Sequence, residues 1–177
     1  VIRLVSWKAS HDIGHKGFSL DYLKRLIELI EDHSRVFLSV EGEIPAQLEK
    51  YKLPIDPTEI HNILYYAELF IGEGATMASE CAVLGTPSVY VNSLSAGSLE
   101  NQAKENLIHM FNSTDGVIEK VEEILKNDNY KTQQKIMRDK ALEKKVDVNK
   151  FMEWFILNYP NSYEKVKENS NLQYEIK

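Results

Sequence analysis

The fold of this chain is decided by the stretch Leu69-Phe70-Ile71-Gly72-Glu73-Gly74-Ala75-Thr76-Met77-Ala78-Ser79-Glu80-Cys81-Ala82-Val83-Leu84-Gly85-Thr86-Pro87-Ser88-Val89-Tyr90-Val91. Three apolar residues at its start are typical of a short buried strand, which the glycines that follow bring to an end. Small residues compatible with a helix continue to Leu84, where Gly85 predicts a C-cap and Pro87 prevents further helix. Residues 88–91 predict a second strand, which completes the βαβ unit of a parallel sheet.

The glycine turn inside this unit favours a phosphate ligand. Glycines let a bound group approach the backbone, and the first N–H groups of the next helix have no partners within it. Together with the helix dipole these groups form a site suited to an anion. The candidate binding residues here are Gly72, Gly74, Ala75, Thr76, Ser79 and Glu80.

Glu80 lies about one turn into this helix. A carboxylate there is better placed to accept hydrogen bonds from ribose hydroxyls than to face a phosphate. The alternative is that the glycines only make a tight turn and that Glu80 is solvated, because Gly-x-Gly alone is a weak motif.

Length and composition describe a globular α/β chain. Its 177 residues suit one domain with a proper core, and the net charge of −6 argues against a nucleic-acid surface. No apolar stretch is long enough to span a membrane, and no signal peptide is recognisable. One cysteine, Cys81, excludes an internal disulfide, so we expect a cytoplasmic protein.

Strand and helix signals alternate along most of the chain. Strands are expected near residues 1–5, 36–40, 69–71, 88–91 and 107–111, with helices between them and further helices at about 130–145 and 148–158. Ser19 and Asp56 are expected N-caps, with Phe18 stapled onto Leu23. The pattern predicts a Rossmann-like three-layer domain over residues 1–160, with a parallel sheet of about five or six strands, and a tail over 161–177 that is weakly ordered or a last helix.

In such a sheet, ligands bind beyond the carboxyl ends of the strands, so loops 6–17, 72–76 and 92–98 are expected at one site. The first loop offers Lys8, His11 and His15, whose side chains suit a diphosphate; His11 and His15 are also candidate general acids or bases. They equally suit a solvated surface. His11, Asp12 and His15 could also be metal ligands, but a metal site is not expected, because the sequence offers no cysteine partner and no obvious further ligand. Glu100 and Gln102, after the third loop, are candidates for contacts to sugar hydroxyls or for a solvated connection.

The run from Gly74 to Glu80, followed by Gly85-Thr86-Pro87, resembles the nucleotide-binding signature in the C-terminal domain of GT-B fold enzymes. The lipid II-forming N-acetylglucosaminyltransferase and the non-hydrolysing UDP-N-acetylglucosamine 2-epimerase share this layout. A closer similarity is to a prokaryotic family of predicted glycosyltransferases, which pairs a segment like residues 7–17 with one like residues 72–80. The resemblance covers about residues 1–160.

This resemblance implies the C-terminal half of a GT-B fold that binds a UDP-type nucleotide sugar as substrate, with the diphosphate on the glycine turn, the ribose on Glu80 and the base near Asp56–Ile60. No cofactor and no metal are implied. The chain opens on Val1 inside a strand, so we expect a missing N-terminal domain that carries most of the acceptor site, and an isolated fragment without activity. The alternatives are a UDP-sugar epimerase and a non-catalytic nucleotide- or sugar-binding module.

Overall fold

A parallel sheet of five strands forms the centre of the computed structural model, which describes residues 1–6, 17–93 and 97–176. The spatial order of the strands is β2-β1-β3-β4-β5. Their bounds are Ile2–Leu4 for β1, Leu38–Val40 for β2, Phe70–Gly72 for β3, Ser88–Val91 for β4 and His109–Phe111 for β5. The predicted Rossmann-like α/β sheet is therefore confirmed.

Strand β1 lies between β2 and β3, with Ile2 opposite Leu38 on one side and Ile71 on the other. The chain runs outward from β1 to β2 and then returns across β1 to β3. Beyond β2, the Leu53 N–H donates to the Leu38 carbonyl at 2.8 Å. The direction of winding thus reverses between β1 and β3, and open α/β sheets hold their ligands at the carboxyl side of such a point.

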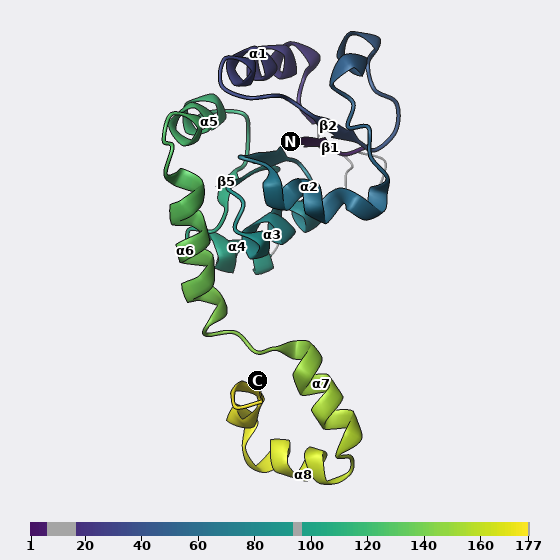
Figure 1. The fold of residues 1–177 in the computed structure, drawn as a ribbon, viewed down its shortest axis with the longest axis vertical. Coiled ribbons are helices and arrows are strands. Elements are labelled where there is room, and N and C mark those ends of the chain that lie inside the picture. The colour runs from purple at the N-terminus through teal and green to yellow at the C-terminus, as the bar shows by residue number, and fades with distance from the viewer. Residues whose placement is uncertain (7–16, 94–96, 177) are drawn as a thin grey trace. The chain divides into compact units, whose positions relative to one another are not determined.

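Helices cover both faces of the sheet (Figure 1). Helices α1 (Leu20–Glu31) and α5 (Val117–Leu125) pack together on one face. Helices α2 (Ile60–Tyr66), α3 (Ala75–Leu84) and α4 (Gly97–Lys104) follow one another on the opposite face. This arrangement results from the reversal of winding, because right-handed crossovers in opposite directions leave the sheet on opposite faces.

The main apolar core lies between the sheet and the α1–α5 pair. Four residues of α1 spaced three or four apart are buried, namely Leu23, Leu26, Ile27 and Ile30. They join buried side chains of the strands and of α5: Ile2, Leu38, Ile71, Val89, Val91, Val117, Val121 and Ile124. Each such aliphatic side chain contributes roughly 1.5–3 kcal/mol when it leaves water, so this layer fixes the sheet from which the loops extend.

Several local signals act as the sequence predicts. The Ser19 side chain accepts from the Tyr22 N–H at 3.2 Å, and Asp56 accepts from the Thr58 N–H at 2.9 Å, where a 3-10 turn (Pro57–Glu59) leads into α2. Gly85 ends α3 with a positive φ of 77°. The Phe18 ring stacks on Tyr22 with ring centroids 5.6 Å apart, and it packs against the core cluster that includes Leu23.

Helix α6 (Tyr130–Leu142) bonds the C-terminal ends of two other helices through two cationic side chains. The Lys131 ammonium donates to the Tyr66 carbonyl at the end of α2, and the Arg138 guanidinium donates to the Val83 carbonyl near the end of α3. Cations stabilise the negative C-terminal ends of helices. Gln134 is buried and donates to the Leu107 carbonyl just before β5.

The chain consists of two compact units, Val1–Arg138 and Asp139–Lys177. The second contains α7 (Val148–Leu157), α8 (Asn161–Glu168) and a final 3-10 turn (Ser170–Tyr174). The Ser162 hydroxyl donates to the Phe155 carbonyl at 2.6 Å and connects α8 to α7. Among the described helices, none is both long and apolar enough to cross a bilayer.

Candidate functional site

The turn between β3 and α3 has the backbone geometry that suits an anion. Gly72 ends β3, and Gly74 is the N-cap of α3 but has no side chain to bond the helix's first N–H groups. The first intrahelical bond runs from the Ala78 N–H to the Gly74 carbonyl at 3.2 Å. Within the described residues, the N–H groups of Ala75, Thr76 and Met77 therefore have no acceptor, and they can face a ligand at the positive end of the helix dipole.

Glu73, between these two glycines, is a functional candidate that the sequence reasoning missed. Its side chain is only 3% exposed. One carboxylate oxygen accepts from the Val5 N–H at 3.2 Å and the other from the Phe18 N–H at 2.5 Å. Val5 follows β1 and Phe18 precedes α1, so this carboxylate lies at the reversal point of the sheet. A charged residue directly after a buried apolar strand was the available signal.

The main chain of Glu73 is held as well. Its N–H points to the Arg3 carbonyl at 3.4 Å, and its carbonyl accepts from the Asn92 side-chain amide at 2.9 Å. Asn92 directly follows β4. The described ends of the three predicted loops therefore meet at this one residue.

Two hollows open beside the turn. The first, which we call the Glu73 pocket, has a volume of about 610 Å³ and is lined by Val5, Gly17, Phe18, Val40, Glu41, Glu43 and Glu73, among others. The charged residues among its described lining are acidic. Like charges repel, so these three carboxylates of the described lining disfavour a diphosphate beside them.

The second hollow, the Arg3 pocket, lies on the α2–α3 side and has a volume of about 430 Å³. Its lining is mostly apolar and includes Leu53, Ile55, Pro57, Ile60 and Met77, together with the cations Arg3 and Lys52. Arg3 donates to the Ser39 hydroxyl at 2.7 Å and pairs with Glu41, and its side chain is 21% exposed. An apolar hollow with two cations suits an anion that carries a flat or apolar group.

Glu80 lies one turn after Met77 on α3, and its side chain is 35% exposed. One carboxylate oxygen is 3.4 Å from the His61 Nε2 of α2, whose side chain is 60% exposed. The carboxylate is accessible to solvent and is not locked in the interior. A hydroxyl-bearing ligand in the neighbouring Arg3 pocket is therefore compatible with its position.

The remaining predicted site residues differ in how exposed their side chains are. Ala75 and Ser79 are half-buried on α3, and Thr76 is exposed. Glu100 is exposed on α4, whereas Gln102 is half-buried there and its Oε1 atom accepts no hydrogen bond from the described residues. Lys8, His11 and His15 lie outside the described residues. The roles of all these side chains stay predictions.

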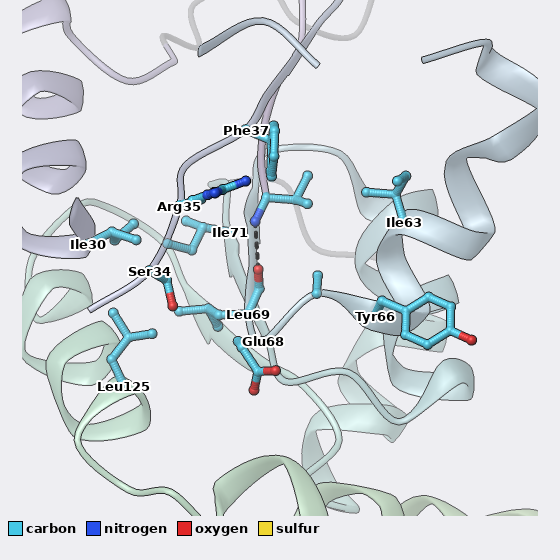
Figure 2. A pocket seen from close by; sticks show the side chains of 12 residues that line it. Ile30, Ser34, Arg35, Phe37, Ile63, Tyr66, Glu68, Leu69, Ile71 and Leu125 are labelled. Carbon is cyan, nitrogen blue, oxygen red and sulfur yellow. Dashed lines mark hydrogen bonds between the residues drawn. The ribbon is translucent and has the colours of Figure 1, made fainter. Parts of the chain in front are cut away.

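A further cavity of about 270 Å³ lies at the opposite, amino edge of the sheet (Figure 2). Ile30, Ile63, Leu69, Ile71 and Leu125 surround it. Helices α1, α2 and α5 end at this edge, so these three helices bring no N-terminal amide groups to it, although Arg35 and the Val1 amino group also line the cavity. The cavity therefore lies at the edge of the sheet opposite to the glycine turn, where the phosphate ligand is predicted.

Neither metal nor thiol chemistry is supported by the described parts of the chain. Within residues 1–6, 17–93 and 97–176, no three His, Cys, Asp or Glu side chains gather closely enough to hold a metal ion. Cys81 is fully buried in α3, and this burial raises the pKa of its thiol far above the ordinary value. A thiol in that state is unreactive and acts as a packing group.

Comparison with known proteins gives a family. A solved structure titled "Crystal Structure Analysis of the Glycotransferase of kitacinnamycin" aligns with 15% sequence identity and a TM-score of 0.47, over 78% of this chain. The chain spans only 38% of the length of that protein. No curated protein matches the sequence. Residues 15–161 match the family described as "Protein of unknown function (DUF354)", and because this is most of the chain, the protein belongs to that family.

Proposed function

We propose that this chain is the donor-binding domain of a nucleotide-sugar-dependent glycosyltransferase and that it binds a UDP-type donor. The observation that carries the proposal is the uncapped first turn of α3 beside the Arg3 pocket. The diphosphate would lie on the amides after Gly74, and the nucleoside would enter the pocket past Met77. This is the chemistry that the sequence resemblance implies for the same turn.

The charged side chains of the described lining favour the Arg3 pocket for the donor. The Glu73 pocket carries Glu41, Glu43 and Glu73, whereas the Arg3 pocket carries Arg3 and Lys52. Arg3 pairs with Glu41 and Lys52 pairs with Glu49, and the two cations would also stabilise a diphosphate in this pocket. The volume of about 430 Å³ in the Arg3 pocket also falls in the ordinary range for small-ligand sites, which is roughly 300–1,000 Å³.

Glu80 would hold the ribose in this arrangement. It stands three residues after Met77, so both side chains lie on neighbouring positions of one helix face. Met77 lines the Arg3 pocket, and among the described residues the ion-pair partner of the Glu80 carboxylate is an exposed histidine, His61, at 3.4 Å. Exchanging that weak partner for two ribose hydroxyls costs little, because an exposed ion pair contributes at most about 1 kcal/mol.

In the transfer reaction this domain would stabilise the departing diphosphate. Charge grows on the leaving phosphate as the bond to the sugar breaks, and preorganised amides at a helix N-terminus stabilise such charge. The acceptor, the sugar and the group that takes the acceptor's proton belong to the whole enzyme.

Calorimetry with UDP tests the proposal on the 177-residue chain. UDP should bind and raise the thermal midpoint, since a ligand at 100 times its Kd adds about 2.7 kcal/mol of stability. Glu80→Gln should weaken UDP binding by about tenfold or more, because a charged hydrogen bond is lost, without lowering the midpoint of the free protein. Glu28→Gln, a matched change on an exposed side chain of α1 on the opposite face of the sheet, should leave the affinity within about twofold.

Two results would refute the proposal. One is the absence of any heat or thermal shift with UDP and with the other nucleoside diphosphates. The other is a Glu80→Gln protein that binds UDP as the unchanged protein does. If UDP binds but the protein with its remaining domains transfers no sugar from any UDP-sugar, the chain is a binding module and not part of a transferase.

A further inference from the structure

We propose that Glu73 is a positioning residue of this site, which fixes both ends of the β1–α1 connection against the first turn of α3. The inference rests on the proposed function for its effect on the donor. In this proposal Glu73 does not touch the nucleotide sugar. It acts through the two backbone segments that it holds.

The geometry of the carboxylate is that of a clamp with two separate contacts. Oε2 accepts from the Val5 N–H, where the chain leaves β1, and Oε1 accepts from the Phe18 N–H, where the chain enters α1. These two residues are 13 positions apart in the sequence, yet one side chain holds both. Each oxygen has a different donor, so both contacts require a carboxylate.

The same residue is linked to the remaining strands at this edge. The Glu73 carbonyl accepts from the Asn92 amide after β4, and the next residue, Gly74, caps α3. A shift at Val5 or Phe18 is therefore transmitted within one residue to the amides that would face the diphosphate. Hydrogen bonds to a buried charged group are among the strong ones in a protein, and this gives the clamp its rigidity.

The direction of the side chain has an electrostatic consequence. A carboxylate next to the first turn of α3 would repel a diphosphate bound there if it faced that ligand. Here the two backbone donors hold it on the β1–α1 side, in the Glu73 pocket, with 3% exposure. The negative charge is thereby satisfied internally, and the α3 amides stay available.

The sign of one measurement separates positioning from simple repulsion. Glu73→Gln removes a negative charge near the proposed diphosphate position, so repulsion alone predicts tighter UDP binding. Positioning predicts the reverse, because the amide group of glutamine offers one acceptor where two are needed and places an N–H donor against a backbone N–H. We expect Glu73→Gln to weaken UDP binding by about tenfold.

Amide hydrogen exchange in the full 177-residue chain gives a readout that needs no ligand. In Glu73→Gln, the amide of Val5 or of Phe18 should exchange at least about tenfold faster, as one of the two hydrogen bonds is lost. Glu43→Gln is the matched control, because Glu43 lines the same pocket but is exposed. It should change neither the exchange of these two amides nor, beyond about twofold, the affinity for UDP.

Glu73→Asp supplies the conservative variant and a fallback if Glu73→Gln does not fold. It keeps the charge and both acceptor oxygens but is shorter, so it should restore part of the amide protection and part of the UDP affinity. The inference is overturned if the Val5 and Phe18 amides of Glu73→Gln exchange as slowly as in the unchanged protein, or if this variant binds UDP more tightly. If only Glu73→Asp folds, the inference is overturned when these two amides exchange in it at the rates of the unchanged protein. If the unchanged protein binds no UDP, the proposed function fails, and the exchange rates still decide whether Glu73 holds the two segments.

Discussion

The side-chain amide of Asn92 donates a hydrogen bond of 2.9 Å to the main-chain carbonyl of Glu73, and this contact joins the end of β4 to the turn after β3. The two residues are 19 positions apart in the sequence. Because the Glu73 carboxylate holds Val5 and Phe18, the contact completes a connection across β1, β3 and β4 at the carboxyl edge of the sheet. The candidate site depends on this connection for its shape.

Replacing Asn92 by aspartate should destabilise the protein. The donor is then replaced by a carboxylate oxygen that faces the Glu73 carbonyl, so we expect the free energy of unfolding to fall by about 1–3 kcal/mol. Urea unfolding measures this change. Asn112→Asp is the control, since Asn112 follows β5 in an equivalent place and is exposed; equal losses in the two variants would show that the Asn92 contact contributes nothing.

The two glycines of the turn should differ in their response to alanine. A Cβ at Gly72 would lie 2.6 Å from the ring of Phe70, which is fully buried, so Gly72→Ala should lower stability by about 1–3 kcal/mol through overpacking. A Cβ at Gly74 would meet Val5 at 3.5 Å, an ordinary contact, and the φ of −90° suits alanine. Thermal unfolding of the two variants tests the difference, and a Gly74→Ala protein that is the less stable of the two contradicts it.

Thr86 should be intolerant of valine despite the similar shape. Its hydroxyl is fully buried and donates to the Leu64 carbonyl of α2 at 2.7 Å. Thr86→Val leaves this carbonyl without that donor in a site closed to water, so stability should drop by about 1–3 kcal/mol. Thr132→Val, at an exposed position of α6, should stay within about 0.5 kcal/mol in the same denaturant titration.

His109 should make stability depend on pH. Burial and the nearby Lys120 lower the pKa of this histidine below 6.5, and its Nε2 lies within hydrogen-bond distance, 2.6 Å, of the Tyr130 hydroxyl. Because the unfolded chain takes up a proton before the folded one, the histidine's contribution to stability is present above pH 6.5. It is lost as the pH falls from 6.5 through the lowered pKa of the folded state.

The measurement for this prediction is the free energy of unfolding between pH 7.5 and pH 5. His109→Gln should remove part of the loss on acidification, since glutamine does not titrate. The control is His33→Gln, because His33 is exposed at the end of α1. Identical pH profiles for the unchanged protein and for His109→Gln would contradict the assignment.

The order of the elements could be predicted from the sequence because its signals are local. A short apolar run, a glycine turn and a capped helix are all read within about ten residues, and so are the Ser19 cap and the left-handed Gly85. The same holds for the shared edge of the loops, since parallel strands place their carboxyl ends together. The stacking of Phe18 on Tyr22 was not predicted, because the orientation of a ring depends on the packing around it.

The sequence by itself thus determined a Rossmann-like sheet with a glycine turn at the N-terminus of a helix. Only the tertiary structure decided that Glu73 turns away from this N-terminus, that its two donors come from residues 55 and 68 positions earlier, and that Arg3 lies in the pocket beside α3. The physical reason is that a buried carboxylate must take whichever donors the packed core brings within hydrogen-bond distance. Which donors reach the Glu73 carboxylate depends on the spacing of strands and helices across the whole sheet and not on the residues next to Glu73 in the chain.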